Sequence, residues 1–293
     1  MGRPSKHESC IDRRTFLRTG TTVACESLVT GIGSASRDVT TVPKRRFEMG
    51  DSFAVGDGRV TAYATTNSVT EVTSLGLHVD NGALDALGNE EVTTRLSFPL
   101  ETTAGDAIDL HQFTFLQFDY VPEGHWPEGV YDTPHLDIQY FMLDRSIVES
   151  ITQRPATYSI PKAQMPADHI RPNVVDTDDD GSPDTPIVEA GRGEPIADPS
   201  SSEHQEDGEF THTHIYGASD PDGDGVGQLT LFEPMVTVDF ADRLDTVTDV
   251  KLNTPAAYAA ADKYPTSYVL QPEGNGGIYV SLTDFESFPG PSR

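Results

Sequence analysis

Apolar and polar side chains alternate with a period of two along much of the chain between Phe47 and Leu282. Segments rich in valine, threonine and aromatic residues are separated by Asp-Gly, Asn-Gly and Gly-Asn pairs, which are typical of tight turns. In the first half, the predicted strands span residues 58–64, 69–79, 92–100 and 113–121. Short strands at this spacing, without a βα repeat, predict a mainly β domain, either an antiparallel barrel or a sandwich.

The most regular alternation follows the turn at Pro134 and runs from His135 to Met142. Successive side chains of a strand point to opposite faces, so one face is apolar and the other carries an imidazole, a carboxylate and an amide. The polar face holds His135, Asp137, Gln139 and Phe141, and the apolar face holds Leu136, Ile138, Tyr140 and Met142. We therefore expect this strand to lie at the centre of the domain, with its apolar face in the core.

The second half of the chain adds three predicted strands, at residues 210–216, 228–240 and 277–282. The first of them places on one face Phe210, His212, His214 and Tyr216. An alanine-rich segment from Thr254 to Tyr264 has a proline near its start, and it predicts the one short helix of the domain.

Residues 162–209 differ in composition from the rest of the chain. Between Asp176 and Glu209 there are twelve acidic residues and a single arginine. Low apolar content with high charge predicts a mobile excursion. Because strand patterning resumes at Phe210, we interpret 162–209 as a long acidic insertion within one domain. The predicted organisation is a leader at 1–36, a linker at 37–46, a single β-rich domain at 47–288 and a tail at 289–293.

The chain is strongly acidic, with 20 basic and 47 acidic residues and a formal net charge of -27. Such a charge repels DNA and anionic membrane surfaces, so we expect no nucleic-acid partner. An acidic surface with few basic residues is typical of proteins adapted to molar salt, where screening shortens charge repulsion. The composition therefore predicts a halophilic, haloarchaeal protein.

The first 36 residues resemble a twin-arginine export signal. Arg13 and Arg14 are followed by a polar residue, then Phe-Leu and a basic residue, ahead of a weakly apolar run to Gly33. Small residues at 34–36 fit a cleavage site, and Cys25 is a second, lipidated alternative for processing. The chain holds no apolar run of about 18 residues, so we expect no transmembrane helix. These features predict an extracellular or cell-surface protein.

Both cysteines of the chain, Cys10 and Cys25, lie in this leader. After cleavage the protein would have no thiol, no disulfide and no thiolate metal site. Cysteine-based catalysis is therefore excluded for the mature form.

Two short motifs resemble calcium-binding loops, with carboxylates at alternate positions and glycine at the sixth. Their twelfth positions hold Ile187 and Leu231, so the bidentate glutamate of an EF-hand is missing from both. The candidate ligands are Asp176, Asp178, Asp180 and Asp184 in the first loop, and Asp220, Asp222 and Asp224 in the second. Solvated acidic loops, which are common in halophilic proteins, fit the same pattern.

Histidines on predicted strands form the second candidate site. Imidazoles two residues apart on a strand point to the same side, as in metal sites inside β-barrels. The candidate ligands for a divalent transition metal are His125, His135, Asp137, His212, His214 and Glu233. The alternative for each histidine is a hydrogen-bonded structural role. Trp126, the sole tryptophan, lies beside His125 on a loop, and we expect it to cap the core rather than to line a pocket.

Three longer motifs resemble an uncharacterised family of secreted β-domain proteins, typified by a small Thermus barrel protein. The motifs are Gly124-His125-x-Pro127-x-Gly129-Val-Tyr-Asp-x-Pro134-His135-x-Asp137, Phe210-Thr-His212-Thr-x-Ile215-Tyr216-Gly217 and Leu231-Phe-Glu233-Pro-Met235-Val-Thr237. The resemblance implies secretion, an antiparallel β fold, self-association into a homo-oligomer and no established activity. Gln139 stands where the family has histidine, and a second family histidine is missing from 193–198, so two implied ligands are absent; His214 is an addition.

We find no Gly-x-Ser-x-Gly elbow, phosphate loop or dinucleotide fingerprint, which weighs against an enzyme. The leading hypothesis is a non-catalytic extracellular binding protein with a histidine-lined pocket, centred on His135 and His212 and able to hold a metal. One alternative is a cupin-like metalloenzyme that uses the same histidines, with Glu233 as ligand or base. The other is a calcium-stabilised structural surface protein. Convergence of His135, His212 and Glu233 within about 5 Å would favour the metal hypotheses, whereas their dispersal over different faces would favour the structural hypothesis.

Overall fold

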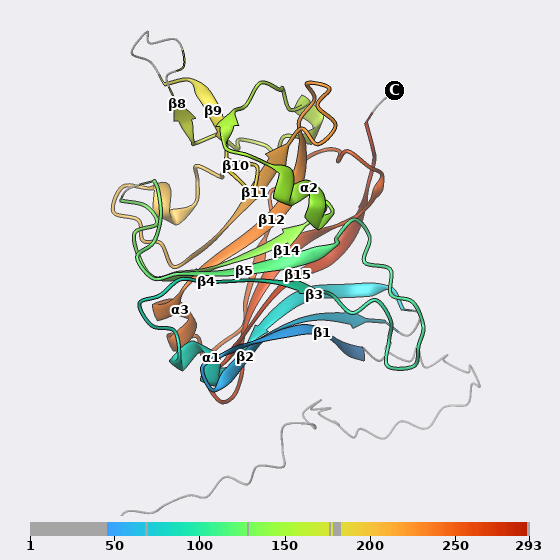
Figure 1. Cartoon of the computed structure of the whole chain (residues 1–293), viewed down its shortest axis with the longest axis vertical. Coiled ribbons are helices and arrows are strands. Elements are labelled where there is room, and N and C mark those ends of the chain that lie inside the picture. Colours follow the sequence, from blue (N-terminus) through green and yellow to red (C-terminus); the bar gives the residue numbers. More distant parts are fainter. Residues whose placement is uncertain (1–45, 68–69, 128, 176, 178–182, 292–293) are drawn as a thin grey trace, which may run out of the picture. The chain divides into compact units, whose positions relative to one another are not determined.

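The computed structural model describes residues 46–67, 70–127, 129–175, 177 and 183–291, all of which belong to one unit of the chain (Figure 1). The predicted leader, with Arg13 and Arg14, lies outside the described residues. So do Asp176, Asp178 and Asp180 of the first acidic loop.

Two antiparallel six-stranded sheets form the domain, and a small three-stranded sheet accompanies them. The first sheet has the order β1 (Arg46–Val55), β2 (Gly58–Thr66), β3 (Val72–Val79), β15 (Ile278–Phe288), β14 (Asp262–Pro272) and β13 (Thr248–Lys251). The second has the order β10 (Glu194–Ile196), β11 (His212–Ser219), β12 (Gln228–Thr237), β6 (His135–Phe141), β5 (Phe115–Val121) and β4 (Val92–Ser97). The small sheet has the order β7 (Arg154–Pro155), β9 (Thr185–Val188) and β8 (Val174–Val175).

The helices of the described residues are short. They are α1 (Asn81–Asp85), α2 (Arg145–Ser150) and α3 (Val238–Arg243), with 3₁₀ turns η1 (Lys162–Gln164) and η2 (Ser202–His204). None of them is long and apolar enough to cross a membrane. The prediction of a mainly β domain is confirmed, and of the two predicted architectures the structure is sandwich-like, with no closed barrel among the described strands.

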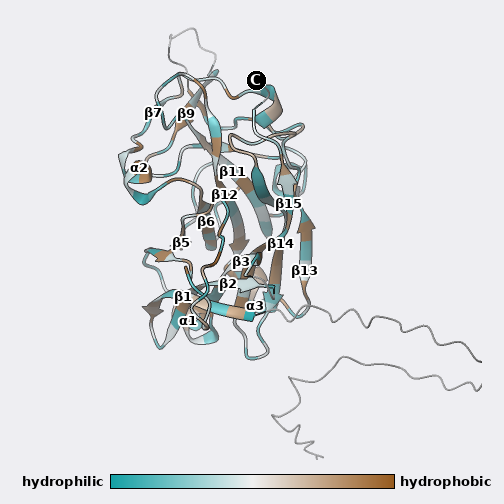
Figure 2. Cartoon of the chain, turned by 90° about the vertical axis from the view of Figure 1, so that its right-hand side faces the viewer, coloured by the Kyte–Doolittle hydropathy of each residue, from teal (hydrophilic) through white to brown (hydrophobic). Residues whose placement is uncertain are grey.

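The main core lies between the two large sheets and follows from the period-two alternation. Figure 2 shows apolar and polar segments alternating along the strands. Leu136, Ile138 and Tyr140 of β6 are fully buried in this core, as the pattern predicts. The Tyr140 hydroxyl donates to the backbone carbonyl of Val280 on the opposite sheet at 2.7 Å. Each large apolar side chain buried here stabilises the fold by about 1.5–3 kcal/mol.

The predicted helix from Thr254 to Tyr264 is wrong. Residues 254–261 are irregular, and β14 begins at Asp262. The backbone N–H groups of Ala257 and Tyr258 donate to the carbonyls of Ala163 and Pro289, so this segment pairs with distant parts of the chain instead of with itself. The predicted strand 228–240 is likewise shorter, because α3 begins at Val238.

The acidic segment 162–209 is not a separate excursion throughout its length. Its strand β10 pairs with β11 at the edge of the second sheet, and Ile196 is fully buried in the main core. Glu194 is fully buried and pairs with Arg171. The described end of the segment is thus part of the domain, and it brings Arg192 over the outer face of the second sheet.

Tyr63 packs closely against a glycine of the neighbouring strand in the first sheet. The ring of Tyr63 on β2 lies over Gly76 on β3, where a Cβ atom would come within 2.3 Å of the ring. Phe47 of β1 stacks on the same ring, with ring centroids 4.4 Å apart. Glycine at position 76 is therefore required for close packing.

Candidate metal centre

A row of polar side chains is buried on the face of the second sheet that points away from the main core. The strand registers place Asp119 of β5 opposite Asp137 of β6, and Gln117 opposite Gln139. Glu233 of β12 lies on the same face. All five are buried. Burial of several carboxylates without compensation is costly, so this face must supply charge compensation of its own.

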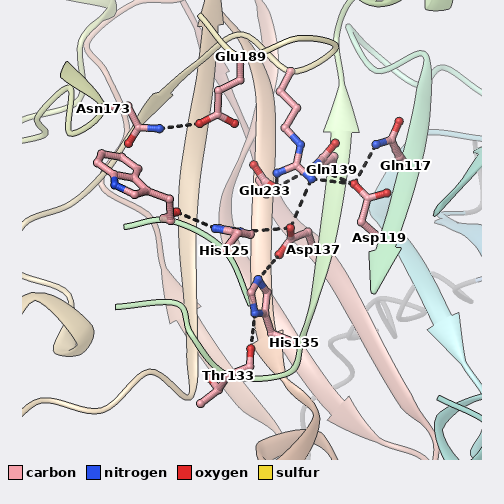
Figure 3. Close-up of polar contacts among 12 residues, drawn as sticks. Gln117, Asp119, His125, Thr133, His135, Asp137, Gln139, Asn173, Glu189 and Glu233 are labelled. Carbon is pink, nitrogen blue, oxygen red and sulfur yellow. Dashed lines mark hydrogen bonds and ion pairs between the residues drawn. The ribbon is translucent and has the colours of Figure 1, made fainter. Parts of the chain in front are cut away.

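Two histidines approach one of these carboxylates from different sides (Figure 3). His135 Nε2 lies 3.1 Å from Asp137 Oδ1, and His125 Nε2 lies 3.5 Å from Asp137 Oδ2. The ligand atoms of the three residues all lie within 4.8 Å of one another. His135 and Asp137 come from one strand, two residues apart, whereas His125 comes from the loop between β5 and β6.

The Nδ1 atoms of both imidazoles are held by backbone carbonyls. His135 Nδ1 donates to Thr133 O at 2.7 Å, and His125 Nδ1 donates to Trp126 O at 2.8 Å. A carbonyl can only accept, so each Nδ1 carries a proton, and in a neutral ring the Nε2 lone pair faces the carboxylate. This second contact, which fixes tautomer and ring orientation, accompanies most metal-ligating histidines.

Four buried atoms, His125 Nε2, His135 Nε2 and both carboxylate oxygens of Asp137, approach one another here without a well-aligned hydrogen bond. Burial alone would lower the pKa of His125, but the adjacent carboxylate of Asp137 raises it to about 9. Burial alone would raise the pKa of Asp137, but His125, His135 and Arg192 hold it well below its ordinary value. The group therefore requires either an additional proton or a cation between its members.

Arg192 is the cation that the structure places beside this group. Its guanidinium lies 2.9 Å from Asp119, 3.5 Å from Asp137 and 3.7 Å from Glu233. Gln139 links two of these carboxylates, donating to Glu233 at 2.8 Å and to Asp119 at 3.3 Å. Three carboxylates against one guanidinium leave a formal charge of about −2 when all are ionised.

This excess negative charge and burial act on the neighbouring groups. Burial raises the pKa of Glu233 to about 7, although Arg192 opposes the shift. Burial would lower the pKa of Arg192, but the charges of Glu233, Asp137 and Asp119 raise it above its ordinary value.

The structure separates the other predicted histidines from this group. His212 pairs with Val236, and Val236 pairs with Leu136. Paired residues share a face of the sheet, and Leu136 faces the main core. His212 and His214 therefore lie on the core side, opposite to the polar row. His212 Nδ1 contacts the hydroxyl of Tyr268 at 2.7 Å. Burial, with the charge of His169, lowers the pKa of His214 to about 3. The expected pocket centred on both His135 and His212 is therefore wrong.

Glu233 is on the predicted face, but it contacts Gln139 and Arg192 and is not one of the three converging residues. Gln139 belongs to this polar network. The sequence analysis did not select Arg192 as a site residue. The sequence feature that could have identified it is that Arg192 is the single arginine among the twelve acidic residues between Asp176 and Glu209.

The second acidic loop turns its first carboxylate inward. Asp220 Oδ1 accepts from the backbone N–H of Gly223 at 2.8 Å, and Oδ2 accepts from Gly225 at 2.9 Å. Asp224 accepts from Val226 N at 2.8 Å. Among the described residues, the one group of three or more ligands that could hold a metal is His125, His135 and Asp137. Asp184, the described member of the first loop, is exposed.

Trp126 does not cap the core, contrary to expectation. It is 55% exposed, and it lines two pockets that also include His125 and Arg192. One is a small cavity of about 40 Å³ that reaches Tyr131 and Glu233. The other is a wider groove over β4 and β5. The candidate metal centre thus lies next to space that small molecules can enter.

No family model matches the chain, and no curated protein or solved structure matches it either. The resemblance to secreted β-domain proteins stays a prediction from the three motifs. Function must therefore be argued from the site.

Proposed function

We propose that this protein binds one divalent transition-metal ion through His125 Nε2, His135 Nε2 and the carboxylate of Asp137. The observation that carries the proposal is the convergence of three ligand atoms, one from each of these residues, within 4.8 Å of one another, with no well-aligned hydrogen bond between them. Two of the atoms are imidazole nitrogens whose Nδ1 partners already fix the tautomer that a metal requires.

The charge of the surroundings supports a divalent ion. With both imidazoles neutral, as ligation requires, and with Asp119, Asp137 and Glu233 ionised around one guanidinium, two positive units would make the buried cluster neutral. Buried charges that lack compensation destabilise a fold, whereas a metal ion relieves them. A monovalent ion would leave one negative charge uncompensated.

The donor set narrows the choice of metal. Imidazole nitrogen suits zinc, copper, iron and nickel, and two histidines with one carboxylate form the set used by three-ligand zinc sites and by non-haem iron(II) sites. None of the three ligands is a thiolate, which disfavours copper(I). We therefore expect zinc or iron(II), with contraction of the present contacts to ligand bonds of about 2.0–2.2 Å.

The function that this site supports best is metal-dependent binding of a small ligand, and catalysis is the second candidate. Three protein ligands leave at least one coordination position open. The adjoining cavity of about 40 Å³ has room for a water molecule. In an enzyme, a metal at this position would activate such a water molecule or polarise a substrate oxygen.

Metal analysis of purified protein tests the proposal. Protein loaded with zinc or iron(II) and freed of excess metal should retain about one ion per chain. His135→Ala and Asp137→Asn should lose it, with affinity reduced at least tenfold. The matched control is His214→Ala, which removes a buried histidine from the opposite face of the same sheet. Equal retention by wild type and His135→Ala, with both folded, would overturn the proposal, as would equal loss in the control.

A cobalt(II)-substituted sample tests whether the metal keeps an open coordination position. Faster relaxation of bulk water in the loaded protein would place an exchangeable water on the metal, as both candidates require. A metal closed to water would contradict both candidates.

We also propose that the protein is exported by the twin-arginine route and works outside the cell in high salt. The leader motif and the acidic composition support this. They say nothing about the metal site, so the two proposals stand independently.

A further inference from the structure

A polar groove runs over β4 and β5 beside the candidate metal centre. It offers about 410 Å³ of solvent-accessible space, within the range of about 300–1,000 Å³ found for small-molecule sites. Its lining includes Glu91, Thr93, Asp119, Trp126, Glu189 and Arg192. We call this the Trp126 groove.

The tryptophan gives the groove an exposed apolar surface. Trp126 is 55% exposed and is the sole tryptophan of the chain. Its backbone carbonyl is bound by His125 Nδ1, which anchors the loop at this residue. An indole ring left in water on the wall of a polar groove is a platform on which a flat, partly apolar ligand can stack.

The polar groups around it match hydroxyl groups. Carboxylates of Glu91, Asp119 and Glu189 accept hydrogen bonds, whereas Arg192 and the hydroxyl of Thr93 donate. Asp119 is 4% exposed, and its Oδ1 has no partner among the described residues. A hydroxyl both donates and accepts, so it can satisfy either kind of neighbour.

The charge of the groove selects against anions. Three carboxylates line it with one guanidinium and the imidazole of His125, and the acidic excess repels anionic ligands. A neutral ligand with many hydroxyl groups and one apolar face meets all these conditions.

We propose that the Trp126 groove binds a neutral carbohydrate, with a pyranose ring stacked on Trp126 and its hydroxyl groups bound by the carboxylates and Arg192. The proposal goes beyond metal binding and does not depend on it. The ligand class follows from the platform, the mixture of donors and acceptors, and the acidic lining.

The sole tryptophan makes the groove directly observable. Titration of the wild-type protein with cellobiose should change the tryptophan emission in a saturable way, and glucuronate at the same concentrations should give a weaker response. Calorimetric titration should show cellobiose binding weakened about tenfold or more in Trp126→Ala and largely kept in Trp126→Phe. Phe47→Ala, which removes a 47%-exposed aromatic residue on β1, is the matched control and should bind as wild type does.

Three outcomes would overturn the carbohydrate proposal. They are no saturable response to cellobiose, equal cellobiose binding by wild type and a folded Trp126→Ala variant, and tighter binding of tetramethylammonium than of cellobiose. The titrations should be done with metal-loaded and chelator-treated protein, and the metal content measured in the same samples. If the metal-loaded sample binds cellobiose but retains no metal, the metal centre alone is refuted. If it retains metal but neither sample binds cellobiose, the carbohydrate site alone is refuted.

Discussion

Replacing Arg192 by methionine tests the charge balance of the candidate metal centre. Methionine keeps an apolar stem but removes the guanidinium that lies 2.9 Å from Asp119, 3.5 Å from Asp137 and 3.7 Å from Glu233. Removing one partner of a buried ion pair destabilises a protein by roughly 3–5 kcal/mol, because the remaining charge stays buried. The Arg192 side chain is 26% exposed, so we expect the lower end of that range, about 3 kcal/mol.

The assay is urea unfolding of the metal-free protein at pH 8, supported by thermal scans. A loss of this size in a domain of this length lowers Tm by about 6–12 °C. The control is Arg243→Met, which breaks an ion pair with Asp239 whose side chains are 65% and 74% exposed. This variant should stay within about 0.5 kcal/mol of wild type.

Two conditions should reduce the loss of unfolding free energy in the Arg192 variant. A bound divalent ion supplies the missing positive charge. Acidification helps as well, because burial raises the pKa of Glu233 to about 7, so this carboxyl becomes neutral as the pH falls through that value and one charge fewer needs compensation. The reasoning would be refuted if the Arg192 variant lost no more unfolding free energy than the Arg243 control. It would also be refuted if neither a bound metal nor pH 5.5 reduced that loss.

In the metal-free protein, Glu233→Gln should flatten the pH dependence of stability between pH 4.5 and about pH 7, because burial raises the folded pKa to about 7 from 4.5. Protonated Glu233 therefore stabilises the folded state fully below the unfolded pKa, and this stabilisation is lost as the pH rises through the folded pKa. If the urea midpoints of Glu233→Gln depend on pH as steeply as those of wild type, this reasoning is contradicted. Gly76→Ala should destabilise the domain by about 1–3 kcal/mol, since its Cβ would lie 2.3 Å from a tyrosine ring of β2. Gly88→Ala meets no atom within 4 Å and should be nearly neutral in the same unfolding assay, and equal effects would count against the packing argument. Replacing Arg13 and Arg14 by lysine should retain the precursor in the cytoplasm, as cell fractionation would show, and normal export of this variant would disprove the signal.

Most strands of the two large sheets could be predicted from the sequence pattern, since the predicted segments overlap β2, β3, β4, β5, β6, β11, β12 and β15. β14 was missed because Pro265 and the preceding alanines favour the end of a helix. The structure tolerates the proline because β13 pairs only with Ser267 to Leu270, so Pro265 faces no strand on that side. Such an arrangement depends on the length of a neighbouring strand, which the sequence of β14 does not contain.

The candidate site was predicted in part. The alternation of β6 correctly placed His135 and Asp137 on a face of their own, away from the main core. The error was to add His212, although it shares its face with the aromatic Tyr216, a residue of the main core. Arg192 could not be placed from sequence, because its role follows from the pairing of β10 with β11 at the edge of the sheet.

The seven residues of β6 are all buried, with apolar side chains on one face and the polar row on the other. A shift of one residue in its pairing would exchange the two faces. It would drive His135, Asp137 and Gln139 into the apolar core and expose three apolar side chains to the carboxylates of the neighbouring strands. His135, Asp137 and Gln139 therefore also disfavour a misaligned pairing of this strand. A substitution that makes the polar face of β6 more apolar would be expected to increase misaligned pairing even where it leaves the native contacts intact.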